Sequence, residues 1–243
     1  MILKSQIGNT SLTSVSQNST IQSPSQIPAL ANGQRSILIL RTNNLKSESP
    51  KLVSAWLLIY IPTTPRLVLL PIFPSISSDY EIENEHLQNT FKISSVNGSH
   101  GLDPLFVEAL RAKVPWWSGY IVIDNIGFAL VLDIWFRTDN EAGNQVSKHP
   151  TGKEILANMP KPWEDAASAL EGQLSLFQEM CQSISNIDNL VELEGLSITL
   201  DDLILSDLNL TQLLTEIQNQ RSQDGGLICE TPSLASISQV SRD

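Results

Sequence analysis

The sequence predicts an α/β protein, with one central mixed β-sheet flanked by helices in a single domain. Several short runs rich in Ile, Leu and Val are bounded by charges or prolines, which is typical of strands. One of these runs, residues 52–61, does not alternate polar and apolar residues, so both of its faces should be covered. The last third of the chain carries a helical periodicity instead. Strands first mixed with helices and then followed by helices indicate one layered α/β domain.

The first three predicted strands follow one another closely. We expect strands at 35–41 ("RSILILR") and 52–61 ("LVSAWLLIYI"), and a third at 66–73 ("RLVLLPIF") after the turn signal "PTTP". Because Pro71 lacks an N–H group, the third strand should fray or bulge there.

The middle of the chain alternates between strands and helices. Residues 89–97 are ambiguous and read as a strand that runs into a loop. Asp103 is a good N-cap and the proline after it fits a first helical turn, which predicts a helix over 103–113. Beta-branched residues predict a strand at 119–125. A short helix at 126–135 would return against the sheet.

The C-terminal part is predicted to be mainly helical. Apolar residues at spacings of three and four predict an amphipathic helix over 163–184. Helix-start signals predict one or two shorter helices over 199–220, and a last short strand is expected at 225–230.

The ends of the chain are expected to lie outside the domain, which we place at 35–230. Residues 1–34 are rich in Ser, Gln, Asn and Thr and cannot bury enough surface to offset the entropy of ordering. We therefore expect them to be a disordered tail or linker, and residues 231–243 to be a flexible C-terminal tail.

Charge and hydropathy exclude several classes of protein. The net charge of −11 and the pI of about 4.7 disfavour nucleic acid as a partner, because phosphate backbones are repelled. No apolar run reaches the ~20 residues that a membrane helix needs, and no signal peptide is visible. Two interpretations stay open: a cytoplasmic protein, or an extracytoplasmic one whose membrane tether is encoded outside this chain.

Residues with reactive side chains give little sign of chemistry. Cys181 and Cys229 have neither CxxC spacing nor histidine partners, so they are either two separate buried thiols or a disulfide, which requires an oxidising compartment. His86, His100 and His149 stand in polar contexts typical of solvated loops. The GxSxG, Walker, HExxH and GxGxxG motifs are all missing. No catalytic residue and no metal ligand is therefore assigned.

One segment resembles a known family. "YIVIDNIGFALVLDIW" (120–135) is similar to the "YxVxVxFxGFxxLVDxxGG" segment of the LytR-CpsA-Psr family of cell-envelope proteins. "FKISSVNG" (91–98) looks like the "KIN" segment of that family, and the helix with Gln173 looks like its "RQ" helix. The resemblance covers roughly residues 35–220. The matches in the main segment are Tyr120, Asp124, Gly127, Phe128 and Asp133.

The resemblance implies a fold rather than an activity. Members of the family transfer a polymer from a polyprenyl-phosphate carrier onto peptidoglycan. They hold pyrophosphate and Mg²⁺ with a Gly-Asp pair after the first strand, an Arg-Asp after the third and further arginines near the last helix. Here the first position reads "LRTNN" (40–44) without Asp, Ser75 stands in place of the Arg, residues 161–172 are acidic, and no "GG" follows Asp133. A neutral Ser cannot replace the charged donor fork of an arginine.

Two features of the matching segment have alternative interpretations. Asp124 and Asp133 mark the transitions from strand to helix and from helix to loop, where side-chain oxygens bond free backbone groups; ligand contact is the alternative. The aromatic side chains near this segment either line an apolar cleft that a polyprenyl chain could occupy or are plain core. These aromatic residues are Trp56, Trp116, Trp117, Phe128 and Trp135.

Three functions follow. We prefer an impaired LytR-CpsA-Psr-like protein of the cell envelope that keeps a polyprenyl-lipid groove without its Mg²⁺ ligands, and that has an elongated apolar cavity between sheet and helices. An active phosphotransferase would need at least three cationic side chains to converge on one point, from the set Arg35, Arg41, Arg66, Lys92 and Arg111. A cytoplasmic acidic interaction module would have no cavity and an exposed apolar stripe on 199–220. The candidate ligand-binding residues are Arg41, Arg66, Lys92, Arg111, Asp124, Trp116 and Trp117.

Overall fold

The structure is a computed structural model. It describes residues 33–76, 80–96, 99–136, 150–184, 202–221 and 227–233. The tails predicted over 1–34 and 231–243 fall almost entirely outside these ranges, and so does His149.

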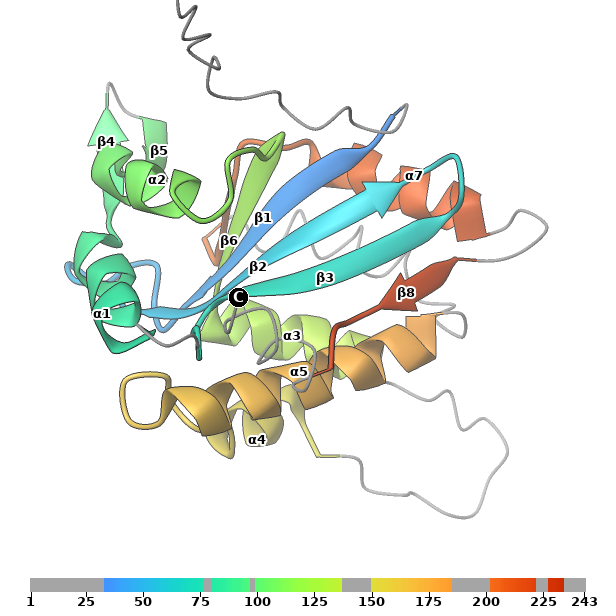
Figure 1. Cartoon of the computed structure of the whole chain (residues 1–243). Helices are drawn as coiled ribbons and strands as arrows, with labels where there is room; N and C mark the ends of the chain where they lie inside the picture. Colours follow the sequence, from blue (N-terminus) through green and yellow to red (C-terminus); the bar gives the residue numbers. More distant parts are fainter. Residues whose placement is uncertain are drawn as a thin grey trace, which may run out of the picture. The chain divides into compact units, whose positions relative to one another are not determined.

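A six-stranded mixed sheet forms the centre of the domain, as predicted (Figure 1). Its strand order is β7-β6-β1-β2-β3-β8. β1 is antiparallel to β2 and parallel to β6, β3 is antiparallel to β2 and parallel to β8, and β7 is antiparallel to β6. The bounds are β1 (Arg35–Thr42), β2 (Leu52–Ile61), β3 (Arg66–Phe73), β6 (Gly119–Asp124), β7 (Ile204–Ser206) and β8 (Ile228–Glu230).

β2 lies in the middle of the sheet and is covered on both faces, which confirms its prediction from an unbroken apolar run. The predicted irregularity at Pro71 is also present. Ala55 pairs with Phe73 while the next residue, Trp56, pairs with Pro71, so Ile72 is the extra residue of a β-bulge.

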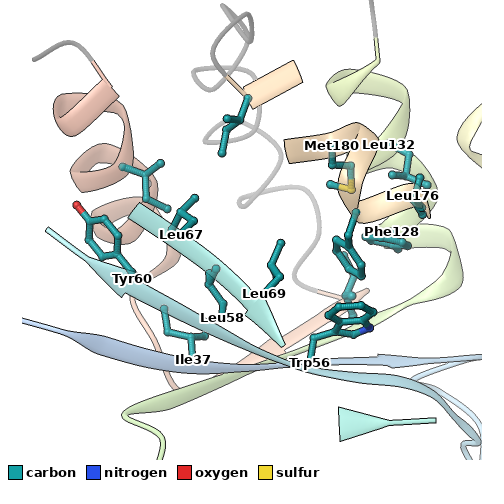
Figure 2. Close-up of a cluster of buried hydrophobic side chains, with 14 of the residues drawn as sticks. Ile37, Trp56, Leu58, Tyr60, Leu67, Leu69, Phe128, Leu132, Leu176 and Met180 are labelled. Carbon is teal, nitrogen blue, oxygen red and sulfur yellow. The ribbon is translucent and has the colours of Figure 1, made fainter. Parts of the chain in front are cut away.

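One face of the sheet carries α3 (Asn125–Trp135), α5 (Ala166–Ser183) and α7 (Leu210–Arg221). Figure 2 shows side chains of the sheet, among them Trp56, Leu58 and Leu69, directed toward Phe128 and Met180 on the helices. The predicted helices at 126–135 and 163–184 are thereby confirmed as α3 and α5, since each packs its apolar side against the sheet.

The other face carries α1 (Tyr80–Thr90) and α2 (Pro104–Arg111). Asp103 caps α2, because its carboxylate accepts a hydrogen bond from the backbone N–H of Leu105 at 2.9 Å. Phe91 and Phe106 pack edge to face with their ring centroids 5.0 Å apart.

The prediction of one or two helices over 199–220 is wrong in part. Residues 204–206 form the strand β7, because Leu205 pairs with Val122 at the free edge of β6, and the helix α7 begins only at Leu210. The structure also contains elements that were not predicted as such: α1, α4 (Gly152–Ala157) and a hairpin of β4 (Ile93–Val96) and β5 (Ser99–Leu102). The last strand is confirmed as β8, with narrower bounds.

Candidate functional site

An apolar cavity of about 240 Å³ lies between the sheet and the helices α3, α5 and α7. Every side chain in its wall is hydrophobic. A water molecule takes up about 30 Å³ in the liquid, so the cavity has room for roughly eight groups of that size. The wall is formed by Ile39, Leu58, Leu67, Leu69, Ile121, Ile123, Phe128, Val131, Trp135, Phe177, Met180, Cys181, Ile184, Ile204, Leu210, Leu213, Leu214, Ile217 and Cys229.

The predicted aromatic cleft corresponds to this cavity only in part. Phe128 and Trp135 line it. Trp56 lies in the same core without reaching the cavity wall, packed on Phe177 with ring centroids 4.5 Å apart. Trp117 packs against the core of the opposite face, and Trp116 is half-buried and lines neither the cavity nor a core cluster of described residues.

A buried polar contact fixes α5 on the sheet close to Trp56. The Gln173 side chain accepts a hydrogen bond from the indole Nε1 of Trp56 at 3.1 Å and donates one to the carbonyl oxygen of Val53 at 3.2 Å. Both polar atoms of this buried amide are therefore satisfied. The contact makes Gln173 a positioning residue for the helix.

A disulfide forms part of the cavity wall. It joins Cys181 on α5 to Cys229 on β8, which lie 48 residues apart in the sequence. β8 is only three residues long and, among the described strands, pairs with β3 at the edge of the sheet. The disulfide therefore supplies a covalent link between this edge strand and the helix across the cavity.

Arg41 is the most unusual charged residue of the described part. It lies near the end of β1 and is only 5% exposed. Its guanidinium carbon is 5.4 Å from the centre of the Phe128 ring, and its Nη1 donates to the thioether sulfur of Met159 at 3.9 Å. Its Nε is buried and has no hydrogen-bond partner among the described residues. Burial lowers the pKa of Arg41 to about 10, so the side chain stays charged at neutral pH.

The contacts of Arg41 do not compensate for its burial. A desolvated cation over an aromatic ring gains about 2 kcal/mol, and a thioether is a weak acceptor. Taking an ion out of water costs several kcal/mol even after the protein relaxes. Among the described residues, Arg41 forms no ion pair with a carboxylate, so nothing of opposite charge offsets the free-energy cost of burying it. Such a position is suited to an anion that is not part of the described protein.

The other predicted cations do not join Arg41. Arg35 pairs with Glu216 at 3.0 Å and Arg66 pairs with Glu230 at 3.8 Å, both at the end of the sheet opposite to Arg41. Lys92 is exposed, and Arg111 lies over the ring of Trp117 on the other face of the sheet, 5.6 Å from its centre. The convergence that an active phosphotransferase would need is not present among these residues.

The two aspartates of the matching segment hold backbone groups. Asp124 accepts a hydrogen bond from the N–H of Gly127 at 2.8 Å and thereby caps α3. Asp133 accepts one from the N–H of Gly152 at 2.6 Å, in the first turn of α4. Both carboxylates thus have structural partners. Asp133 bonds the backbone of the neighbouring helix α4 rather than the loop that follows α3.

The edge of the sheet where β1, β3 and β6 end does not fit a pyrophosphate and Mg²⁺ site. The Asn43 side chain accepts from the N–H of Lys51 at 2.7 Å, and the backbone of Ser75 pairs with Asn84 through bonds of 2.8 and 2.9 Å. No group of three or more His, Cys, Asp or Glu side chains that could hold a metal ion occurs in the described residues. The neutral groups at these two positions cannot replace an Asp and an Arg.

A second cleft at this edge is acidic. It has a volume of about 550 Å³ and lies between α1 and the start of α5. A phosphate group would be repelled there because carboxylates of both segments contribute to the wall. These carboxylates are Glu81, Glu85, Glu164 and Asp165, and Trp163 also lines the cleft, with Lys51 Nζ 4.9 Å from the centre of its ring.

No protein-family model matches the sequence, and no curated protein matches it. Solved structures do match in fold. TagT bound to LIIa-WTA aligns with a TM-score of 0.51 and 12% identity over 86% of this chain and 88% of that chain. A protein from Streptococcus agalactiae aligns with a TM-score of 0.53 and 9% identity over 84% and 77%. A transcription regulator from Eubacterium siraeum aligns with a TM-score of 0.50 and 12% identity over 92% and 89%.

The chain therefore has the fold that the sequence resemblance implies. TagT belongs to the LytR-CpsA-Psr family, and the alignment spans most of both chains. At 9–12% identity the likeness defines a shared fold and leaves the activity to be argued from this chain's own residues.

Proposed function

We propose that this chain is a cell-envelope protein of LytR-CpsA-Psr fold that holds the apolar end of a polyprenyl lipid and does not transfer a glycopolymer. The observation that carries the proposal is the cavity between the sheet and α3, α5 and α7, whose wall is hydrophobic throughout. Apolar chains gain free energy on entering such a space at about 25 cal/mol for each Å² removed from water.

The volume of the cavity limits how much lipid it holds. Room for roughly eight groups the size of a water molecule is less than a polyprenyl chain of many isoprene units occupies. Such a chain would extend out of the cavity, so only one end of the lipid would be bound within the domain.

Impaired transfer is supported by the edge of the sheet where the resemblance places the reaction. Asn43 and Ser75 stand where an Asp and an Arg are expected, and the neighbouring cleft is lined by carboxylates. Each charged hydrogen bond to a pyrophosphate is worth about 1.5–3 kcal/mol, so the loss of several removes most of such a site.

A location in the envelope is supported by the disulfide between Cys181 and Cys229, because disulfides persist in oxidising compartments.

No helix among the described residues has both the length and the apolar character that crossing a membrane requires.

The acidic interaction module is the less favoured function. It predicts a domain without a cavity and an apolar stripe exposed on residues 199–220. In the described part of that segment, Leu213 and Ile217 of α7 are buried against the sheet, and both line the cavity.

A binding titration with polyprenyl phosphate in detergent micelles tests the proposal. Leu214→Trp places a large ring in the cavity wall, whereas Leu105→Trp changes a side chain that is 66% exposed on the opposite face. We expect one lipid to bind per chain, Leu214→Trp to weaken binding at least tenfold, and Leu105→Trp to leave it unchanged. Equal binding by the two variants, or no binding by the native chain, would overturn the proposal.

A further inference from the structure

We propose that Arg41 is an oxyanion-binding residue, whose buried guanidinium binds a phosphate group in the place that the Met159 sulfur now occupies. The phosphate is either free or the headgroup of a lipid. For a headgroup the inference rests on the proposed function, whereas for free phosphate it stands alone.

The position of Arg41 follows from the pleat of β1. Ile37 and Ile39 point to the face that carries α3 and α5, and Arg41 follows them at the same spacing of two. The pattern brings the guanidinium over one side of the Phe128 ring, and the same ring contributes to the wall of the apolar cavity. The cation and the cavity therefore adjoin through one shared side chain.

The protein itself leaves the guanidinium unpaired within the described residues. The carboxylate nearest in strand register belongs to Asp124, which pairs with Thr42 across β1 and β6, and its side chain is used to cap α3. Arg41 Nε has no partner, and Arg41 Nη1 has only the sulfur of Met159. A buried guanidinium presents a planar fork of donors that matches the oxygens of a phosphate.

The side chain of Met159 is one that a ligand could displace from the guanidinium of Arg41. It lies between α4 and α5, just after the C-cap of α4, and its side chain is half-buried. Methionine is unbranched and flexible, and its thioether accepts hydrogen bonds only weakly, so a phosphate oxygen would displace it from the guanidinium.

Arg66 offers a matched control. Its Nε is also buried without a partner among the described residues, but its guanidinium pairs with Glu230 and its side chain is 43% exposed. A response that depends on Arg41 and not on Arg66 separates a specific site from a general effect of positive charge.

Inorganic phosphate binding is measured by the shift in melting temperature and by ³¹P NMR, at constant ionic strength with chloride as the reference anion. We expect saturable binding to the native chain, at least a tenfold loss in Arg41→Met, no change in Arg66→Met and tighter binding in Met159→Ala. Arg41→Met should fold, because it replaces an unpaired buried charge by an apolar side chain of similar length.

A second arm identifies the source of the phosphate. The native chain and Arg41→Met are compared for binding of polyprenyl phosphate and of the uncharged polyprenol. A headgroup site predicts that Arg41→Met weakens binding of the phosphate lipid at least tenfold and leaves polyprenol binding unchanged.

The outcomes distinguish the two proposals. Phosphate binding through Arg41 without binding of either lipid supports this inference and overturns the proposed function. Equal binding of both lipids, with no response to phosphate or to Arg41→Met, overturns this inference and leaves the proposed function standing.

Discussion

The Asp124 carboxylate is 2% exposed and accepts a hydrogen bond from the backbone of Gly127, so it holds the junction between β6 and α3. Replacing it by Ala removes the cap and leaves a buried N–H group without a partner. We expect Asp124→Ala to lower the free energy of unfolding by about 2 kcal/mol, measured by urea denaturation.

Asp124→Asn serves as the control for that change, because Asn keeps an acceptor oxygen and is an equally good N-cap. It should lose less than half as much stability. Equal losses in the two variants would mean that the negative charge, rather than the cap, is what the position needs.

Gly152 lies where α4 meets α3. A Cβ atom at this position would fall inside the van der Waals distance of the Ala129 carbonyl oxygen, which is backbone and cannot swing aside. We expect Gly152→Ala to destabilise the fold by about 1–3 kcal/mol, as overpacking does, with the melting temperature as the measurement.

Gly172 in the middle of α5 is the matched control for the change at Gly152. A Cβ atom there would lie 3.7 Å from Pro160, which is an ordinary contact. Gly172→Ala should therefore stabilise the helix by about 0.5–1 kcal/mol. A loss of stability in this variant would show that α5 is packed more closely than the structure has it.

The burial of Arg41 can be predicted from its own strand, but its contacts cannot. Arg41 follows Ile37 and Ile39 at a spacing of two residues, so its side chain is expected on the same buried face of the strand, and this spacing is visible in the sequence. Its partners Met159 and Phe128 are 118 and 87 residues away in the sequence, and no local pattern predicts that they meet it.

Strands and helices could be predicted where burial leaves a strong local pattern. β2 is buried on both faces and reads as an unbroken apolar run, and the missing N–H of Pro71 marks the bulge in β3. α1 was missed because, among its residues 81–90, only Leu87 is fully buried, so this stretch lacks an apolar period in the sequence. Thr151 and Glu154 form a capping box, a signal that would have predicted the start of α4.

β7 could not be predicted from its own sequence, because it forms a strand only by pairing with β6, a distant part of the chain. Residues 204–206 are a strand since they complete the edge of β6, more than 80 residues earlier. The surrounding leucines fit a helical period equally well, and a three-residue strand is too short to show alternation.

The disulfide connects α5 to the edge strand β8. Closing a loop of 48 residues removes entropy from the unfolded chain, which is worth about 4 kcal/mol in the chain-entropy model. We expect the Cys181→Ser and Cys229→Ser double variant to lose roughly 2–4 kcal/mol of unfolding free energy in urea denaturation.

A reducing agent provides the control for the disulfide prediction. It should lower the stability of the native chain by a similar amount and leave the double variant unchanged. A native chain that is indifferent to the reductant would mean that the two thiols are not bonded in solution.

The cavity belongs to the domain as a whole. Its wall draws on β1, β2, β3, β6, β7 and β8 together with α3, α5 and α7, from Ile39 to Cys229. The sequence predicted an apolar space between sheet and helices and two of the aromatic residues that line it, Phe128 and Trp135. The alternation of the strands does not determine how completely the helices fill the space above them, so the volume and most of the wall required the three-dimensional structure.

The most direct test of the lipid-binding account is native mass spectrometry of the full chain purified from several expression hosts. We predict a species heavier than the bare chain by the mass of one polyprenyl lipid, and loss of this species in Leu214→Trp. A mass equal to that of the bare chain from every host, in preparations that also fail to take up added polyprenyl phosphate, would contradict the account.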